Sequence, residues 1–136
     1  MQTIIGLGQA GCNIADQFKQ YSQYNIIKID TGLKKTKKTF GLKRQTSPEL
    51  YEENIPASLE KLLQKEVMSE TLFITSCGII SGASLSILEK IKTKTKIKLM
   101  YIIPRQTDLV GDKKSQNNLL FNCLLYTSDA ADEEDS

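Results

Sequence analysis

The stretch GLGQAGCN, residues 6–13, contains three glycines with the spacing G-x-G-x-x-G. A β-branched run at residues 2–5 precedes it, and apolar residues at helical spacing follow it. Gly8 and Gly11 let the backbone approach a phosphate and let the helix pack on the sheet, and the free N–H groups of that helix would face the anion. The stretch therefore predicts a strand, a phosphate-binding turn and a helix. A strand-to-helix turn that holds no ligand also fits this spacing.

Strands and helices are predicted to alternate along the rest of the chain. Strands are expected at residues 26–29, 72–76 and 97–103, and residues 32–43 are expected to form a lysine-rich loop. Helices are expected from Ser47-Pro48, after Pro56, after the Gly78–Gly82 turn and after Gly111. This alternation predicts an α/β fold, a three-layer Rossmann-like parallel sheet. Ligands gather at the carboxyl ends of such strands, where both glycine turns, Asp30 and the Pro104 loop would converge.

Length and composition restrict the class of protein. At 136 residues, 40% hydrophobic, the chain is long enough for one packed domain. The three cysteines lack C-x-x-C spacing and histidine is absent, which argues against a structural zinc site and a disulfide framework. Neither a membrane-spanning apolar run nor a signal peptide is recognisable, so we expect a cytoplasmic protein without a membrane partner.

The charge is distributed unevenly. Five of the sixteen acidic residues lie in the last eight positions, so residues 1–125 carry a net charge of +7. Such a basic body can bind an anionic polymer or can simply be a solvated lysine surface. The lysines alternate with threonine and are not interleaved with aromatic residues. A nucleic-acid partner is therefore not expected.

The tail at residues 126–136, YTSDAADEEDS, has no apolar periodicity. It is too acidic and too rich in small residues to bury a surface, so we expect disorder. It also resembles translated adaptor read-through at the end of a reading frame. We therefore expect residues 1–125 to form the domain, with the natural chain continuing beyond them, and the tail to be foreign and without function.

One interpretation of the first turn is a dinucleotide-binding fingerprint. An acidic residue about twenty positions after the last glycine binds a ribose in that fingerprint, and Asp30 follows Gly11 at that distance. The amino-terminal half alone fits an NAD(P)-binding domain of an oxidoreductase.

The residues between the glycines favour a second interpretation of the first turn. Gly8-Gln9-Ala10-Gly11, followed by Asn13, resembles the first nucleotide loop of tubulin, and GLGQAGCN is similar to the corresponding loop of FtsZ. FITSCGIISGASLSILEKI, residues 73–91, resembles the strand, GGGTG(T/S)G loop and helix of that family. Matching positions in this loop are Gly78, Ser81, Gly82 and Ala83. Further on, the family pattern of proline, acidic, glycine and basic residues is echoed by Pro104, Asp108, Gly111, Lys113 and Lys114.

The resemblance implies the amino-terminal part of a tubulin/FtsZ GTPase domain that binds GTP or GDP with Mg²⁺. The intact protein would assemble head to tail into filaments. Asn13 would lie toward the base, Asp108 toward the ribose and Cys12 beside the nucleotide, although a small buried thiol fits Cys12 equally. The other expected nucleotide contacts are Gly8, Gln9, Ala10, Gly11, Gly78, Ser81, Gly82 and Ala83. Catalytic acidic residues belong to a later loop of the family, so the chain contains no expected catalytic residue and should be inactive alone.

The second loop departs from the family pattern. Ile79 and Ile80 stand where the family has glycines, and Ser84 replaces the last one, as in divergent phage or plasmid tubulins. Bulky β-branched residues avoid positive φ, so the loop should run through ordinary backbone conformations. We expect both isoleucines to turn away from the crevice into apolar surface. In the first loop, a side chain at Gly11 should abolish nucleotide binding while leaving the sheet folded.

Overall fold

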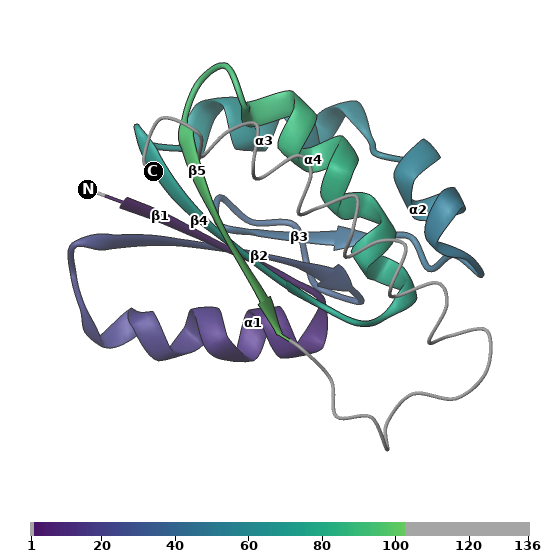
Figure 1. Ribbon diagram of the computed structural model, residues 1–136, viewed down its shortest axis with the longest axis horizontal. Helices are drawn as coiled ribbons and strands as arrows, with labels where there is room; N and C mark the ends of the chain where they lie inside the picture. The colour runs from purple at the N-terminus through teal and green to yellow at the C-terminus, as the bar shows by residue number, and fades with distance from the viewer. Residues whose placement is uncertain (1, 103–136) are drawn as a thin grey trace.

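The computed structural model describes residues 2–102, which form a five-stranded sheet in the order β3-β2-β1-β4-β5 (Figure 1). All four pairings between neighbouring strands are parallel. The strands are β1 (Gln2–Leu7), β2 (Tyr24–Thr31), β3 (Thr39–Leu42), β4 (Glu70–Ser76) and β5 (Lys96–Ile102). The predicted α/β fold with a parallel sheet is confirmed.

Helices cover both faces of this sheet, which gives three layers (Figure 1). One face carries α1 (Gly8–Gln17), which continues into the 3₁₀ turn η1 (Phe18–Gln20). The opposite face carries α2 (Pro48–Glu53), α3 (Ala57–Glu66) and α4 (Ser84–Ile91). Side chains alternate along β1, so Ile4 enters the core under α1 while Ile5 and Leu7 enter the larger core under the other helices.

Strand β3 was not predicted, because residues 32–43 were interpreted as a loop. Phe40 and Leu42 are each 5% exposed and pack into the larger core. The strand contains only four residues and follows a run of lysines, so its two buried side chains give almost no periodic signal. The lysines on either side of β3 indicate a loop, but they lie outside the strand itself.

The helix start at Ser47-Pro48 is confirmed. The Oγ of Ser47 accepts a hydrogen bond from the Leu50 N–H at 3.3 Å, and Pro48 occupies the first helical position. Strands β2, β4 and β5 each begin before the predicted residue. The predicted Pro104 loop, Asp108, the last helix and the tail lie outside the described residues. Within residues 2–102, every helix is too short or too polar to cross a membrane.

Candidate functional site

The centre of the sheet contains a topological switch point between β1 and β4. The two strands are paired, but β1 continues into α1 on one face while β4 continues toward α4 on the other (Figure 1). In open parallel sheets a ligand-binding crevice lies at the carboxyl ends of such strands. The two glycine turns that the sequence singled out follow these two ends. The carboxyl end of β2, which carries Asp30, lies on the other side of β1.

The first turn places the amino end of α1 at the carboxyl end of β1. The helix begins at Gly8, which has a φ of +79°. Residues with a side chain rarely adopt this backbone conformation. The preceding residue, Leu7, makes no side-chain capping hydrogen bond, and the first helical turn contains no acidic residue. The N–H groups and the positive end of the helix dipole therefore lack a side-chain cap at this end, as anion-binding helix termini do.

Gly6 and Gly11 have a different role, because they let α1 lie directly on the sheet. A Cβ atom on Gly6 would be 2.5 Å from the carbonyl oxygen of Gly11. A Cβ atom on Gly11 would be 2.6 Å from the carbonyl oxygen of Ile74 in β4. A side chain at Gly11 would thus disturb the packing of α1 on the sheet. This contact argues against the expectation that such a variant keeps its sheet intact, which stays a prediction.

Gln9 and Asn13 are the exposed members of the first turn. They are four residues apart on α1 and so lie on one face of the helix, while Ala10 between them is half-buried. Both polar side chains are accessible to a molecule bound at the end of the sheet. Their predicted contacts with phosphate and base stay predictions.

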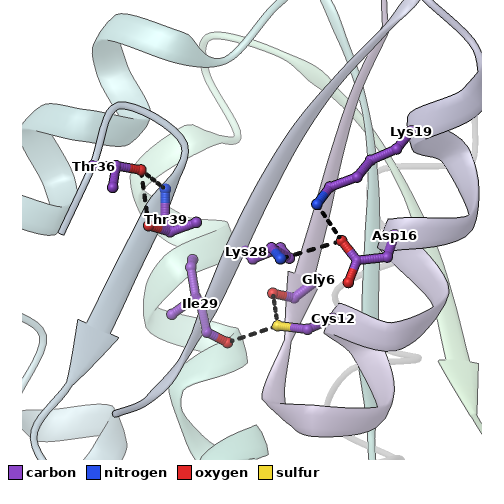
Figure 2. Close-up of polar contacts among 8 residues, drawn as sticks. All are labelled: Gly6, Cys12, Asp16, Lys19, Lys28, Ile29, Thr36 and Thr39. Atoms are coloured by element: carbon purple, nitrogen blue, oxygen red, sulfur yellow. Dashed lines mark hydrogen bonds and ion pairs between the residues drawn. The ribbon is translucent and has the colours of Figure 1, made fainter. Parts of the chain in front are cut away.

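Cys12 lies beneath the first turn, where it links three elements (Figure 2). Its Sγ lies 3.4 Å from the carbonyl oxygen of Gly6 and 3.6 Å from that of Ile29, so the single thiol proton is shared between two acceptors. Burial, together with the negative charge of Asp30, raises the pKa of this thiol from 9.0 to about 11. The contacts favour the interpretation of Cys12 as a small buried thiol.

Alkylation should distinguish this buried thiol from a reactive one. In a Cys77→Ser, Cys123→Ser background, we expect iodoacetamide to modify Cys12 at pH 8 about 100-fold more slowly in the folded protein than in denaturant, from the thiolate fractions alone. Because the folded pKa is the higher one, the free energy of unfolding should fall as pH rises from about 9 to about 11. Equal alkylation rates in the two states would contradict the buried geometry.

The second turn, η2 (Ile79–Ala83), is a 3₁₀ helix. Among the described residues only glycines have positive φ, and Gly78 is extended at φ −169°. The predicted ordinary backbone conformation of this loop is confirmed. A Cβ atom on Gly78 would meet no atom of residues 2–102 within 4 Å.

A buried hydroxyl network fixes the second turn to β4. The Oγ of Ser81 donates to the carbonyl oxygen of Ser76 and accepts from the Oγ1 of Thr75 at 3.1 Å. The Oγ of Ser84 donates to the same Thr75 oxygen at 3.2 Å. Sequence reasoning missed Thr75 and assigned Ser84 no role, because a short polar residue in a strand or at a helix start has no distinctive pattern. The Ser81 hydroxyl is used within the protein, and so is its backbone: its N–H donates to the carbonyl oxygen of Gly78 at 3.0 Å, and its carbonyl oxygen accepts from the Ser84 N–H.

Gly82 and Ala83 face the protein interior. A Cβ atom on Gly82 would overlap the carbonyl group of Pro48, so the absence of a side chain there lets η2 pack against the start of α2. Ala83 is fully buried in the larger core. The glycine at position 82 thus has a packing role whether or not a ligand binds.

The two isoleucines of η2 lie in different environments. Ile80 packs against the larger core, and its Cγ2 methyl would be 3.0 Å from a Cβ atom added to Gly8. Ile79 is 40% exposed. The expectation that both side chains turn into apolar surface is therefore wrong for Ile79. Ile80 does pack against apolar residues, as expected. Its Cγ2 methyl group, however, lies beside the first glycine turn and narrows the space between the two turns.

Asp30, near the carboxyl end of β2, is half-buried. Its Oδ1 accepts a hydrogen bond from the Thr31 N–H at 2.8 Å, which fixes the side chain at the edge of the sheet. The second carboxylate oxygen has no hydrogen bond from another described residue in this arrangement. A ribose hydroxyl at the end of β1 and β2 would meet an acceptor there.

Comparison of the chain with protein-family models, with curated proteins and with solved structures found no match. A functional assignment therefore depends on the geometry of the two turns and on the sequence resemblance.

Proposed function

We propose that the carboxyl edge of β1 and β4 binds the phosphates of a nucleotide. The observation that carries this proposal is the start of α1, where Gly8 adopts a positive φ and the helix end has no side-chain cap, at the switch point of a parallel sheet. Backbone N–H groups in this position bind phosphate without any charged side chain. The exposed Gln9 lies at the same helix end.

The nucleotide that we propose is GTP or GDP, bound by a divergent member of the tubulin/FtsZ family. The resemblance of both glycine turns supports this choice, and the structure places the second turn beside the first. Among residues 2–102, no cluster of three or more His, Cys, Asp or Glu side chains could hold a metal ion. Mg²⁺ would therefore enter with the phosphates that it accompanies. Head-to-tail assembly and GTP hydrolysis on assembly are part of the same proposal for the intact protein.

Asp30 favours one alternative, a dinucleotide-binding domain. The strand order 3-2-1-4-5 is that of the dinucleotide fold, in which an acidic residue at the end of β2 binds the ribose. Asp30 occupies that place and is half-buried. This alternative uses the first glycine turn but assigns no role to the second.

A thermal-shift titration distinguishes the two ligands. We expect GTP with Mg²⁺ to stabilise the protein and NAD to leave it unchanged; a ligand at about 100 times its Kd adds about 2.7 kcal/mol. Gln9→Ala should weaken the GTP effect, whereas Asp30→Asn, the matched control, should not. Stabilisation by NAD that Asp30→Asn removes would instead establish the dinucleotide alternative.

A further inference from the structure

A groove lined by lysines lies between α3 and the connection from β2 to β3, remote from the two glycine turns. It has a volume of about 410 Å³. The connection and the helix are distant in sequence, so only the fold brings their lysines together. Its lining residues are Lys35, Thr36, Lys37, Ser58, Lys61, Leu62, Lys65 and Glu66. We call this feature the lysine groove.

The lysine groove extends along α3. A neighbouring hollow of about 510 Å³ shares Lys61 and Lys65 with it and adds Ala57, Glu60 and Gln64. The pair of hollows forms an elongated basic surface, because the two shared lysines stand between them. Such a shape suits an extended anion better than a compact one.

The charges of the lysine groove are poorly neutralised. Lys37, Lys61 and Lys65 make no ion pair with a carboxylate among residues 2–102, and the groove contains four lysines against one glutamate. That glutamate, Glu66, already pairs with Lys38 at 3.5 Å. Lys61 and Lys65 are four residues apart on one helix face, where like charges repel. An anion bound in the groove would relieve this repulsion.

In another hollow that is lined by lysines, the lysines do make ion pairs with carboxylates. It is lined in part by Lys19, Lys28 and Lys38. Lys19 and Lys28 both reach the Oδ1 of Asp16, at 3.1 and 3.2 Å (Figure 2). Burial by itself would raise the pKa of Asp16, but the hydrogen bonds from both lysines lower this pKa below its ordinary value. Each of these three lysines therefore has a carboxylate partner, since Lys38 pairs with Glu66, whereas Lys37, Lys61 and Lys65 of the lysine groove have none among residues 2–102.

The connection that carries Lys35 and Lys37 is held in place before any ligand binds. The Oγ1 of Thr36 accepts from the N–H groups of Lys38 at 3.2 Å and Thr39 at 3.0 Å, and contacts the Thr39 hydroxyl (Figure 2). The Oγ1 of Thr39 in turn donates to the carbonyl oxygen of Lys34 at 2.6 Å. These bonds fix the backbone between the two lysines, so less ordering is required on binding.

We propose that the lysine groove binds the phosphate backbone of a nucleic-acid duplex without reading its bases. Lysines and the Ser58 hydroxyl are groups that contact phosphate, and the lining contains no Arg, Asn or Gln, whose planar ends pair with the edges of guanine and adenine. The lining also lacks the aromatic side chains on which single-stranded bases stack. This proposal departs from the sequence expectation, which judged the lysines by their order along the chain.

The salt dependence of duplex binding tests the proposal. Fluorescence anisotropy of a labelled duplex of about 20 base pairs, with the full chain, should give a slope of log K against log salt of about −3.6 for four lysine contacts. Lys61→Gln combined with Lys65→Gln should bring the slope to about −1.8. The matched control, Lys94→Gln with Lys98→Gln, removes the same charge near β5, at the opposite edge of the sheet, and should keep the original slope.

Three outcomes would overturn the proposal. The first is absence of duplex binding at about 50 mM salt, where phosphate contacts are strong. The second is an equal loss in both double variants, which would show attraction by net charge alone. The third is competition by polyglutamate as effective as that by unlabelled duplex, which would assign the groove to an acidic protein. None of these outcomes depends on nucleotide binding at the glycine turns.

Discussion

Gly11→Ala is expected to destabilise the protein by about 3 kcal/mol or more, at the upper end of the effects of overpacking. The added Cβ would be 2.6 Å from the carbonyl oxygen of Ile74, and a backbone atom in a central strand cannot rotate away. The helix would have to move off β4, which also separates it from β1. A loss of this size is a large part of the total stability of a small domain. Urea denaturation followed by circular dichroism measures it.

Gly78→Ala is the matched control, because it adds the same atom to the other glycine turn. Gly78 is extended, and a Cβ there would meet nothing within 4 Å in the described part of the chain. We expect the free energy of unfolding of this variant to stay within about 0.5 kcal/mol of the parent. If Gly11→Ala were as stable as Gly78→Ala, the direct packing of α1 on β4 would be incorrect.

The contrast between these glycines shows what the sequence could and could not predict. The G-x-G-x-x-G spacing and the alternation of apolar runs predict the parallel sheet, because they depend on local order along the chain. The spacing does not reveal which glycine faces a ligand. In the fold, Gly8 provides a positive φ, whereas Gly6 and Gly11 provide close packing. A positive φ and close packing both require glycine, so the motif alone does not tell which glycine has which role.

Apart from β3, the features missed from the sequence depend on contacts in three dimensions and not on the order of residues along the chain. Gly82 packs against the start of α2, and the Thr75 hydroxyl joins Ser81 to Ser84. The lysine groove likewise combines a loop and a helix that are separated by about twenty residues of other structure. Periodicity and spacing describe neighbours along the chain, so they carry no information on such pairs. β3 was missed for a different reason, since two buried residues are too few to define a period.

Ile80 is expected to limit how closely a nucleotide can approach the first turn. Its Cγ2 methyl lies beside Gly8, between the two glycine turns that the proposed site requires. Ile80→Ala removes this methyl group, and we expect the affinity for GTP with Mg²⁺ to rise about 10-fold, or about 1.4 kcal/mol. Because Ile80 also packs against the core, the variant should lose about 1–2 kcal/mol of stability, less than a fully buried isoleucine would.

Ile79→Ala separates this effect from a general loosening of η2. Ile79 is 40% exposed, so its truncation should change neither stability nor affinity by more than about 0.5 kcal/mol. Isothermal titration with GTP and Mg²⁺, with circular dichroism to verify folding, compares the two variants and the parent. A tighter complex for Ile80→Ala alone would locate the phosphates beside Gly8, since the Ile80 methyl lies next to that residue. If Ile80→Ala stays folded but loses the GTP binding of the parent, Ile80 is part of the contact surface for the nucleotide, and its role as an obstacle is refuted.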